Sequence, residues 1–217
     1  MKLSKRLSAV AAFVPEHARL ADIGSDHAKL PLSLLERGQI EFAIAGEVVR
    51  GPFEIAQAAT AATDKIIVRL ADGLSAFTAA DRIDTLVIAG MGGLLIRDIL
   101  AADAKKAASV KRLILQANNE EEALRRWLTA RHFAIVAEEL VEDKGKIYDI
   151  LVAEVGAQQL TENQLRFGLQ QDSPIFQDKW QRRLDEIDKV LVLLPEKETQ
   201  QRTRLTDEKR QILEVLR

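Results

Sequence analysis

The chain has 217 residues, with 31 lysines and arginines against 33 aspartates and glutamates, and a formal net charge of −2. It contains no cysteine, which excludes disulfides, a thiolate nucleophile and a cysteine-based zinc site. The balanced charge neither supports nor excludes a nucleic-acid partner, and the length accommodates one α/β domain with a small second element.

The sequence shows no membrane or export signal. No apolar run approaches the roughly 18 residues that suggest a membrane span. The first eight residues lack the apolar core and the cleavage pattern of a signal peptide. We therefore expect a cytoplasmic protein with no membrane partner, and we assign no metal ligands.

Short apolar, β-rich runs alternate with helix-like segments as far as about residue 155. This alternation predicts βαβ units and a parallel sheet with helices on both faces. The predicted strands are Arg19–Ile23, Phe42–Glu47, Ile66–Leu70, Thr85–Ala89, Arg112–Gln116, Phe133–Glu138 and Ile147–Glu154. The predicted helical segments are Leu30–Arg37, Gly51–Ala62, Leu74–Phe77, Leu94–Ala101 and Glu120–Ala130.

The last two predicted strands differ from the others. Only the segment from Leu140 to Lys146, with Gly145 in it, is available to connect them. Because this is too short for a helical crossover, the two strands should form an antiparallel hairpin. Five parallel strands closed by an antiparallel pair are typical of class I methyltransferases, whose Rossmann-like α/β sheet is the fold that we predict.

The composition changes after about Gly156. Residues 157–175 are rich in glutamine and contain Gly168 and Pro174, which indicates a linker with a partly ordered segment. We therefore expect a methyltransferase domain over residues 1–156, followed over residues 157–217 by the linker and a helical hairpin.

The hairpin is predicted from apolar spacing in the strongly helical sequence after Phe176. A heptad-like stripe predicts a coiled-coil-like first helix, and Pro195 should end it. The first stripe consists of Trp180, Leu184, Ile187, Leu191 and Leu194. A second stripe, on the second helix of the hairpin, consists of Leu205, Ile212, Leu213 and Leu216. The alternative is that these stripes pack on the catalytic domain.

The first predicted strand ends in a small-residue turn that contains Asp22, Gly24, Ser25 and Asp26. Gly24 permits close backbone approach, and the following helix offers unpaired N–H groups. Asp26 stands where a dinucleotide-binding fingerprint has its second glycine. A carboxylate there is unfavourable for a pyrophosphate but suits the sulfonium and ammonium groups of S-adenosylmethionine. The alternative is a simple turn and helix cap.

Three further strand ends carry candidate ligand-binding residues. Glu47 lies about 20 positions after the glycine turn, where a carboxylate holds a ribose diol. Asp72-Gly73 is placed to accept from an adenine amino group, and Gly90-Met91-Gly92 lets the backbone approach a ligand. Each has an ordinary alternative as an exposed carboxylate or a turn. All four positions nevertheless fall at the carboxyl edge, where open α/β sheets bind ligands.

These motifs together resemble the bacterial TrmK family, which uses S-adenosylmethionine to methylate N1 of adenine 22 in tRNA. The chain departs from the family at Lys29, where tyrosine is usual, and at Ala117, where proline is usual. The resemblance rests on Leu3–Leu7, Asp22–Ala28, Gly46–Val48, Gly51–Phe53, Ile88–Gly93, Leu113–Gln116 with Asn118, Arg125 with Trp127 and Leu128, and Glu142–Asp143 with Lys146 and Tyr148. It implies cofactor binding by Arg6, Asp22, Gly24, Ser25, Asp26, Glu47, Asp72, Gly73, Gly90, Met91 and Gly92.

Adenine N1 has a lone pair and no proton, so the reaction requires alignment and tolerance of a new cation more than a general base. We assign Asp26 to orient the adenine amino group or to stabilise the positive ring, with a cap or a cofactor contact as its alternative. His27 is a second catalytic candidate, although a lone histidine is more often structural. Gln116 and Asn118 are expected to position the base.

Two other functions stay open at this stage. One is methylation of a small molecule or a protein, and the other is a non-catalytic nucleotide-binding protein whose helices dock a partner. For tRNA binding, Arg182, Arg183, Arg202 and Arg204 on the helical hairpin could reach phosphates, or could simply form a solvated face. The sequence does not determine the oligomeric state, for which we favour a monomer.

Overall fold

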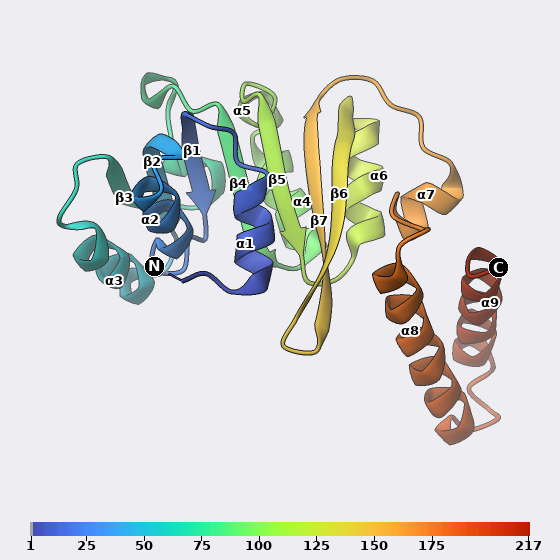
Figure 1. Cartoon of the computed structure of the whole chain (residues 1–217). Coiled ribbons are helices and arrows are strands. Elements are labelled where there is room, and N and C mark those ends of the chain that lie inside the picture. Colours follow the sequence, from blue (N-terminus) through green and yellow to red (C-terminus); the bar gives the residue numbers. More distant parts are fainter. Residues whose placement is uncertain (1) are drawn as a thin grey trace. The chain divides into compact units, whose positions relative to one another are not determined.

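A computed structural model describes residues 2–217. Within them, seven strands form one sheet in the order β3-β2-β1-β4-β5-β7-β6 (Figure 1). Strands β1 to β5 pair in parallel, and β7 pairs antiparallel with both β5 and β6. The strands are β1 (Ala18–Ile23), β2 (Ile40–Glu47), β3 (Ile66–Leu70), β4 (Thr85–Met91), β5 (Arg112–Ala117), β6 (Phe133–Asp143) and β7 (Lys146–Val155).

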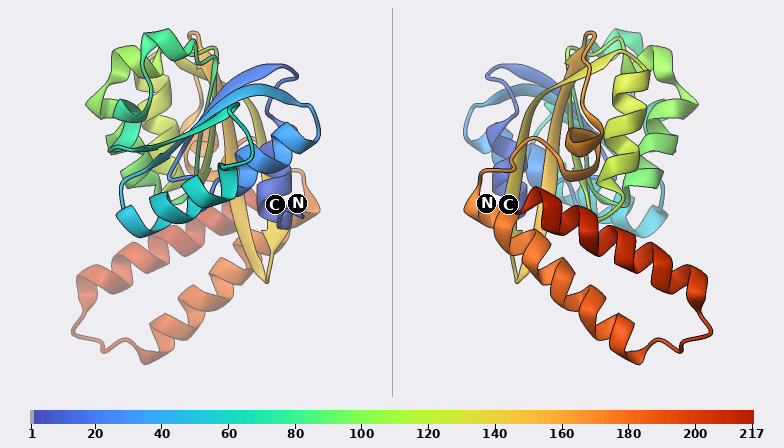
Figure 2. Two further views of the ribbon diagram at one scale, coloured as in Figure 1. Left: turned by 90° about the vertical axis from the view of Figure 1, so that its left-hand side faces the viewer. Right: turned by 90° about the vertical axis from the view of Figure 1, so that its right-hand side faces the viewer.

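Helices cover both faces of the sheet, with α1, α2 and α3 on one face and α4 and α6 on the other (Figure 2). The elements that connect the strands are α1 (Lys5–Ala12), α2 (Lys29–Glu36), α3 (Arg50–Thr60), the 3-10 turns η1 (Gly73–Ala76) and η2 (Ala79–Asp81), α4 (Gly93–Ala102), α5 (Ala104–Ala107) and α6 (Glu121–Ala130). The predicted class I methyltransferase fold, a mostly parallel Rossmann-like sheet with an antiparallel last pair, is therefore confirmed.

The β6–β7 hairpin is longer than the sequence pattern indicated. We expected Leu140–Lys146 to connect the strands, but pairing continues to Asp143 opposite Lys146. Lys144 and Gly145 alone make the turn, with φ angles of 52° and 76°. Positive φ at both central residues is the tight hairpin geometry that matches the twist of the strands, and glycine adopts it without steric cost. The hairpin therefore extends as a paired ribbon.

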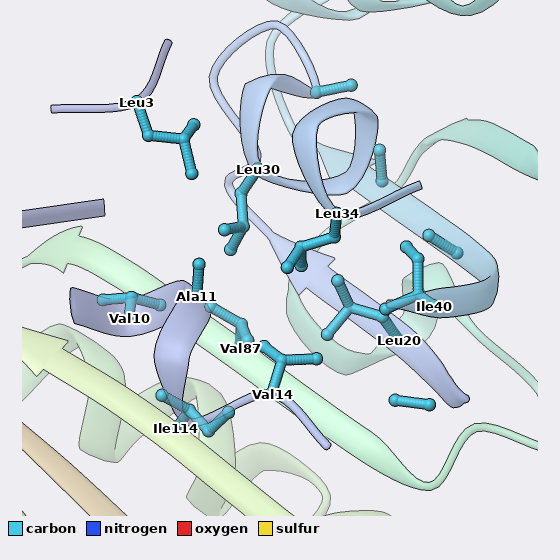
Figure 3. Packing of buried hydrophobic residues seen from close by; sticks show 14 of the residues in the cluster. Leu3, Val10, Ala11, Val14, Leu20, Leu30, Leu34, Ile40, Val87 and Ile114 are labelled. Carbon is cyan, nitrogen blue, oxygen red and sulfur yellow. The ribbon is translucent and has the colours of Figure 1, made fainter. Parts of the chain in front are cut away.

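Helix α1 was not among the predicted helices. It begins where the Ser4 hydroxyl accepts a hydrogen bond from the Leu7 backbone N–H at 3.2 Å. Val10 and Ala11 on this helix are buried against the sheet, together with Leu20 of β1 (Figure 3). This packing fixes the start of the chain beside the strands.

A buried ionic cluster ties α6 to the last two strands. Arg125 is 1% exposed, and its guanidinium contacts Glu138 of β6 and Asp149 of β7, the latter at 2.7 Å. It also reaches the Leu165 and Arg166 carbonyls at 3.5 and 3.4 Å. The two carboxylates compensate the buried cation, so the cluster depends on all three members.

Backbone contacts group the chain into two compact units, one up to Arg166 and one over Phe167–Arg217. Helix α7 (Glu162–Phe167) lies at this division, ten residues beyond the domain boundary expected at residue 156. That earlier boundary stays a prediction.

The second unit is a helical hairpin made of α8 (Pro174–Leu193) and α9 (Thr199–Val215). Ser173 caps α8, and Pro174 occupies its first turn, where a missing N–H costs nothing. Leu184 and Ile187 of the predicted stripe are buried. The helix ends two residues before Pro195. The hairpin was expected, whereas its coiled-coil packing stays a prediction.

Candidate functional site

The candidate residues gather at the carboxyl edge of the sheet. The strand order reverses between β1 and β4, since β1 leads to β2 and β3 on one side and β4 leads to β5 on the other. Such a reversal opens a crevice at the carboxyl ends of the strands, which is the usual ligand position in α/β sheets. The loops that follow β1, β2, β3 and β4 all lie at this edge.

Gly24 makes the turn after β1 with φ of 70°. Its N–H donates to the Gly46 carbonyl at 2.9 Å, which joins the ends of β1 and β2. A Cβ atom at this position would lie 2.2 Å from Cε of Met91, so the end of the Met91 side chain would have to move. The positive φ is the stronger reason for glycine at this turn.

Asp26, His27 and Ala28 continue this turn with φ angles of 44°, 71° and 56°. Left-handed backbone costs about 1–2 kcal/mol per residue in side-chain-bearing amino acids, so three in succession need compensation. The compensation comes from Glu47, whose carboxylate accepts the backbone N–H groups of Asp26 and His27.

Glu47 ends β2 and is 6% exposed. Its Oε1 atom is buried and has no hydrogen-bond partner within residues 2–217. Desolvation raises the pKa of Glu47, and the N–H groups of Asp26 and His27 only partly offset it. A buried, unpaired carboxylate oxygen is costly and usually marks a place where a ligand donates.

Asp22 lies beneath the same turn and is 4% exposed. Its Oδ2 accepts the Ser25 hydroxyl at 2.6 Å. Burial raises the pKa of Asp22 to about 7; the Ser25 hydrogen bond lowers it, and the nearby charges of Glu47 and Asp26 raise it further. A cation placed beside Asp22 would favour its charged form and lower this pKa again.

Asp72 and Gly73 lie in the loop after β3, on one side of the crevice. Asp72 caps η1, and its carbonyl accepts the Ser75 backbone N–H at 3.1 Å. The Ala71 N–H donates to the Glu47 carbonyl at 2.8 Å, which fixes this loop to the end of β2. A surface cavity of about 440 Å³ opens between η1 and α4 and includes Asp72, Gly73, Leu74 and Leu95 in its lining.

A second group of candidates meets at the ends of β4 and β5. Oε1 of Gln116 accepts the Gly90 backbone N–H at 2.9 Å and also contacts the Arg6 guanidinium. Nδ2 of Asn118 donates to the Gly90 carbonyl at 2.8 Å. The Asn118 N–H donates to the Met91 carbonyl, also at 2.8 Å. The structure thus brings Arg6 to the residues expected to position the base.

Gln116 uses both ends of its amide inside the protein. The side chain is 0% exposed, and Nε2 donates to the Ala117 carbonyl at 2.7 Å and to Oδ1 of Asn118 at 3.1 Å. Both amide hydrogens and the oxygen are therefore engaged. Gln116 holds the strand ends in place, whereas Asn118 is exposed at the surface of this group.

Asp26 and His27 lie at the mouth of the crevice. The Asp26 side chain is 73% exposed, and its Oδ2 pairs with Nζ of Lys29 at 3.2 Å. Nδ1 of His27 stands 3.7 Å from the other Asp26 oxygen. Asp26 is consequently an accessible carboxylate, and Lys29 is its direct partner.

The sequence interpretation missed two neighbours of this site. The Tyr148 ring on β7 lies under the Arg6 guanidinium, with 5.6 Å between Cζ and the ring centroid. The Asn119 carbonyl accepts the Gly93 N–H at 2.9 Å and so closes the β4 loop against the β5 loop. Tyr148 is the chain's one tyrosine and was visible as part of the family motif, but its contact with Arg6 depends on the position of α1.

Within residues 2–217, no group of three or more histidine, aspartate or glutamate side chains could hold a metal ion. No helix among these residues is long and apolar enough to cross a membrane.

The family model for TrmK, tRNA (adenine(22)-N(1))-methyltransferase, matches residues 20–215. The chain belongs to the TrmK family. This confirms the resemblance in the sequence motifs. The tRNA (adenine(22)-N(1))-methyltransferase of Bacillus subtilis is 43% identical over 159 residues, which cover 72% of this chain and 66% of that protein, just under two thirds of its length.

Solved structures extend the similarity over the whole chain of this TrmK-family protein. A Streptococcus agalactiae protein of the NADB-Rossmann superfamily is 48% identical, with a TM-score of 0.95 and coverage of 100% of this chain and 98% of that one. A Streptococcus pneumoniae protein in complex with S-adenosyl-L-methionine is 46% identical, with a TM-score of 0.92 and coverage of 100% of both chains. The helical hairpin is therefore shared with both relatives.

Proposed function

We propose that this protein transfers a methyl group from S-adenosylmethionine to N1 of adenine 22 in tRNA. The observation that carries the proposal is the buried, unpaired Oε1 of Glu47 at the carboxyl edge of a TrmK-family sheet. An adenosine ribose would give that oxygen the hydroxyl donor that it lacks.

The described residues fit the cofactor. Glu47 would hold the ribose, and Asp72 with Gly73 would accept the adenine. Asp22 and the Gly24–Ser25 turn would lie near the cationic methionine portion, whose positive charge would favour the carboxylate form of Asp22. Gly90, Met91 and Gly92 would border the cofactor from the β4 side. S-adenosylmethionine supplies an electrophilic methyl group carried on a sulfonium.

The acceptor half of the site consists of Gln116 and Asn118 around Gly90, together with Arg6, which we first assigned to the cofactor and which contacts Gln116. Adenine N1 forms the new bond with the methyl carbon while the sulfur–methyl bond breaks, and the positive charge passes to the adenine ring. No proton leaves N1, so the chain needs no base at that atom. Gln116 acts as a positioning residue, since its amide is engaged internally, and the exposed Asn118 presents the polar edge to the base.

Asp26 is the accessible carboxylate that we assign to the adenine, either at its amino group or beside the positive ring. His27 adjoins Asp26 and would help to hold its orientation. A preorganised charge of this kind is worth about 100-fold or more in rate. The ion pair with Lys29 keeps Asp26 at the mouth of the crevice, where the base must enter.

The base has to be unpaired when it reacts, because N1 lies on the Watson–Crick edge. We propose that a monomer carries out the reaction in the cytoplasm, where tRNA is present. The support for a monomer is that every candidate residue, from Arg6 to Asn118, belongs to one compact unit of one chain.

The test is methylation of unmodified tRNA with saturating cofactor, with the modified position mapped. Methylation at adenine 22, and none in a tRNA with guanine at that position, is the expected result. Methylation of proteins or metabolites but not of tRNA would refute the proposal. Under single-turnover conditions Asp26→Ala should react about 100-fold more slowly while its cofactor affinity stays nearly unchanged. A wild-type rate for this variant would leave Asp26 as a cap or a cofactor contact.

A further inference from the structure

Four exposed lysines stand at the sheet edge that carries the site, and none forms an ion pair among the described residues. Lys2 precedes α1 and Lys5 begins it, whereas Lys144 lies in the β6–β7 turn and Lys146 follows it. We propose that this basic surface, defined by Lys2, Lys5, Lys144 and Lys146, binds the phosphate backbone of the tRNA whose adenine enters the site. This inference rests on the proposed function and names the surface that receives the substrate.

The two parts of the basic surface are joined by hydrogen bonds, so the lysines keep a fixed arrangement. Oδ2 of Asp143, the last residue of β6, accepts the Arg6 backbone N–H at 3.3 Å, and the Ser4 side chain also bonds to this carboxylate. The Asp143 charge is thereby used inside the contact between α1 and the hairpin. Glu142 beside it is engaged in a contact of its own. The four lysines are exposed, and only Lys144 has a charge interaction with the neighbouring Asp143.

The basic surface adjoins the acceptor half of the site. Strand β5 ends at Ala117, which pairs with Asp149 of β7. The hairpin continues beyond that pair through Tyr148 to Lys146, three residues or roughly 10 Å at the usual strand rise. Figure 1 shows the β6–β7 turn projecting past the ends of the neighbouring strands. A nucleotide whose base lies against Asn118 would therefore keep its neighbouring phosphates on the side of the lysines.

Arg6 links the two regions directly. Its backbone N–H contacts Asp143 in the basic surface, and its guanidinium contacts Gln116 in the acceptor half. Lys5 precedes it in the first turn of α1. Backbone binding on one side and base placement on the other thus share one helix, which ties the register of the RNA to the site.

Most of the four arginines of the helical hairpin are already bound to groups of the protein and are less available to RNA phosphates. Arg182 pairs with Asp178 at 2.6 Å, and Arg183 pairs with Glu208 at 2.8 Å. Arg202 donates to the Leu191 and Leu194 carbonyls at 3.0 and 2.7 Å. Of the four arginines singled out in the sequence, Arg204 alone has no partner within the described part of the chain. The unpaired lysines are the stronger match for a polyanion.

The net charge of −2 strengthens the same conclusion. A chain without an overall positive charge cannot attract tRNA through its total field, so a local surface must provide the attraction. Lysines that contact phosphates release counterions, and each such contact adds nearly one to the slope of log affinity against log salt.

The experiment measures tRNA affinity by fluorescence anisotropy over a series of KCl concentrations. The variants are Lys144→Gln/Lys146→Gln and Lys2→Gln/Lys5→Gln. The matched control is Lys65→Gln/Lys111→Gln, two exposed lysines at the amino ends of β3 and β5, on the opposite edge of the sheet. Each site variant should lose about two from the salt slope and bind tRNA more weakly at every salt concentration, while the control matches the wild type.

Cofactor affinity, measured on the same samples, should be equal in all variants, which separates lost RNA contact from misfolding. Site variants with the wild-type slope and tRNA affinity, or a wild type that does not bind tRNA, would overturn the inference. A wild type that binds tRNA through these lysines but does not methylate it would refute the proposed function and leave this surface standing.

Discussion

The sharpest consequence of the site concerns Glu47. Replacing it with alanine removes the acceptor for the Asp26 and His27 N–H groups and the free Oε1 that would take the ribose hydroxyls. Hydrogen bonds to a charged group contribute about 1.5–3 kcal/mol. At 1.4 kcal/mol per factor of ten, Glu47→Ala should weaken S-adenosylmethionine binding by about 10- to 150-fold.

Isothermal titration calorimetry of the folded variant provides the measurement. Glu41→Ala is the matched control, because Glu41 lies on the same strand at its amino end, with a side chain that is 59% exposed. It should bind the cofactor as the wild type does. Glu47→Gln keeps the shape of the side chain and one acceptor oxygen, so its loss should fall between the two. Unchanged affinity in folded Glu47→Ala would show that this carboxylate does not hold the cofactor.

Two further predictions concern stability. Because burial raises the pKa of Asp22 from 3.8 to about 7, the folded state holds an extra proton between these pH values. The free energy of unfolding should therefore fall as pH rises through this window, by at most about 4 kcal/mol. Urea unfolding at a series of pH values should show that Asp22→Asn lacks this part of the dependence of unfolding free energy on pH. The same pH dependence in the variant and the wild type would show that another group holds the proton. Arg125→Met should destabilise the fold by about 3–5 kcal/mol, since it leaves Glu138 and Asp149 buried without their cation. Its neighbour Arg126 is 41% exposed, so Arg126→Met should cost about 1 kcal/mol or less, and equal losses in the two variants would contradict the buried-cluster argument.

The central strands β1, β4 and β5 were predictable because their burial is nearly continuous. Thr85 to Ile88 of β4 are all buried, and an uninterrupted apolar run is what the sequence shows there. Helix α1 was not predicted although its sequence is amphipathic, because it has only eight residues. Val10 and Ala11 become buried when the helix packs on the sheet. Tertiary packing, rather than local propensity, determines this helix.

The candidate site also has parts that the sequence predicts and parts that depend on tertiary contacts. Strand-end residues such as Glu47 and Asp72 could be placed at one edge because parallel strands finish together. Their partners could not be placed. The left-handed run from Asp26 to Ala28 exists because Glu47 accepts its N–H groups, and that acceptor lies about 20 residues away in the chain. Such a contact leaves no trace in the local spacing.

Gln116 shows what the structure adds to a functional assignment. From the sequence it looked like a residue that touches the base, but its amide is completely used by Gly90, Arg6, Ala117 and Asn118. A reaction at a nitrogen that already carries a lone pair needs its partners aligned more than it needs a proton acceptor. A saturated amide suits that need, since it fixes three chain segments relative to one another and has no group left to titrate. In the proposed mechanism Gln116 therefore contributes rigidity, and the accessible carboxylate of Asp26 supplies the charge that the reaction requires.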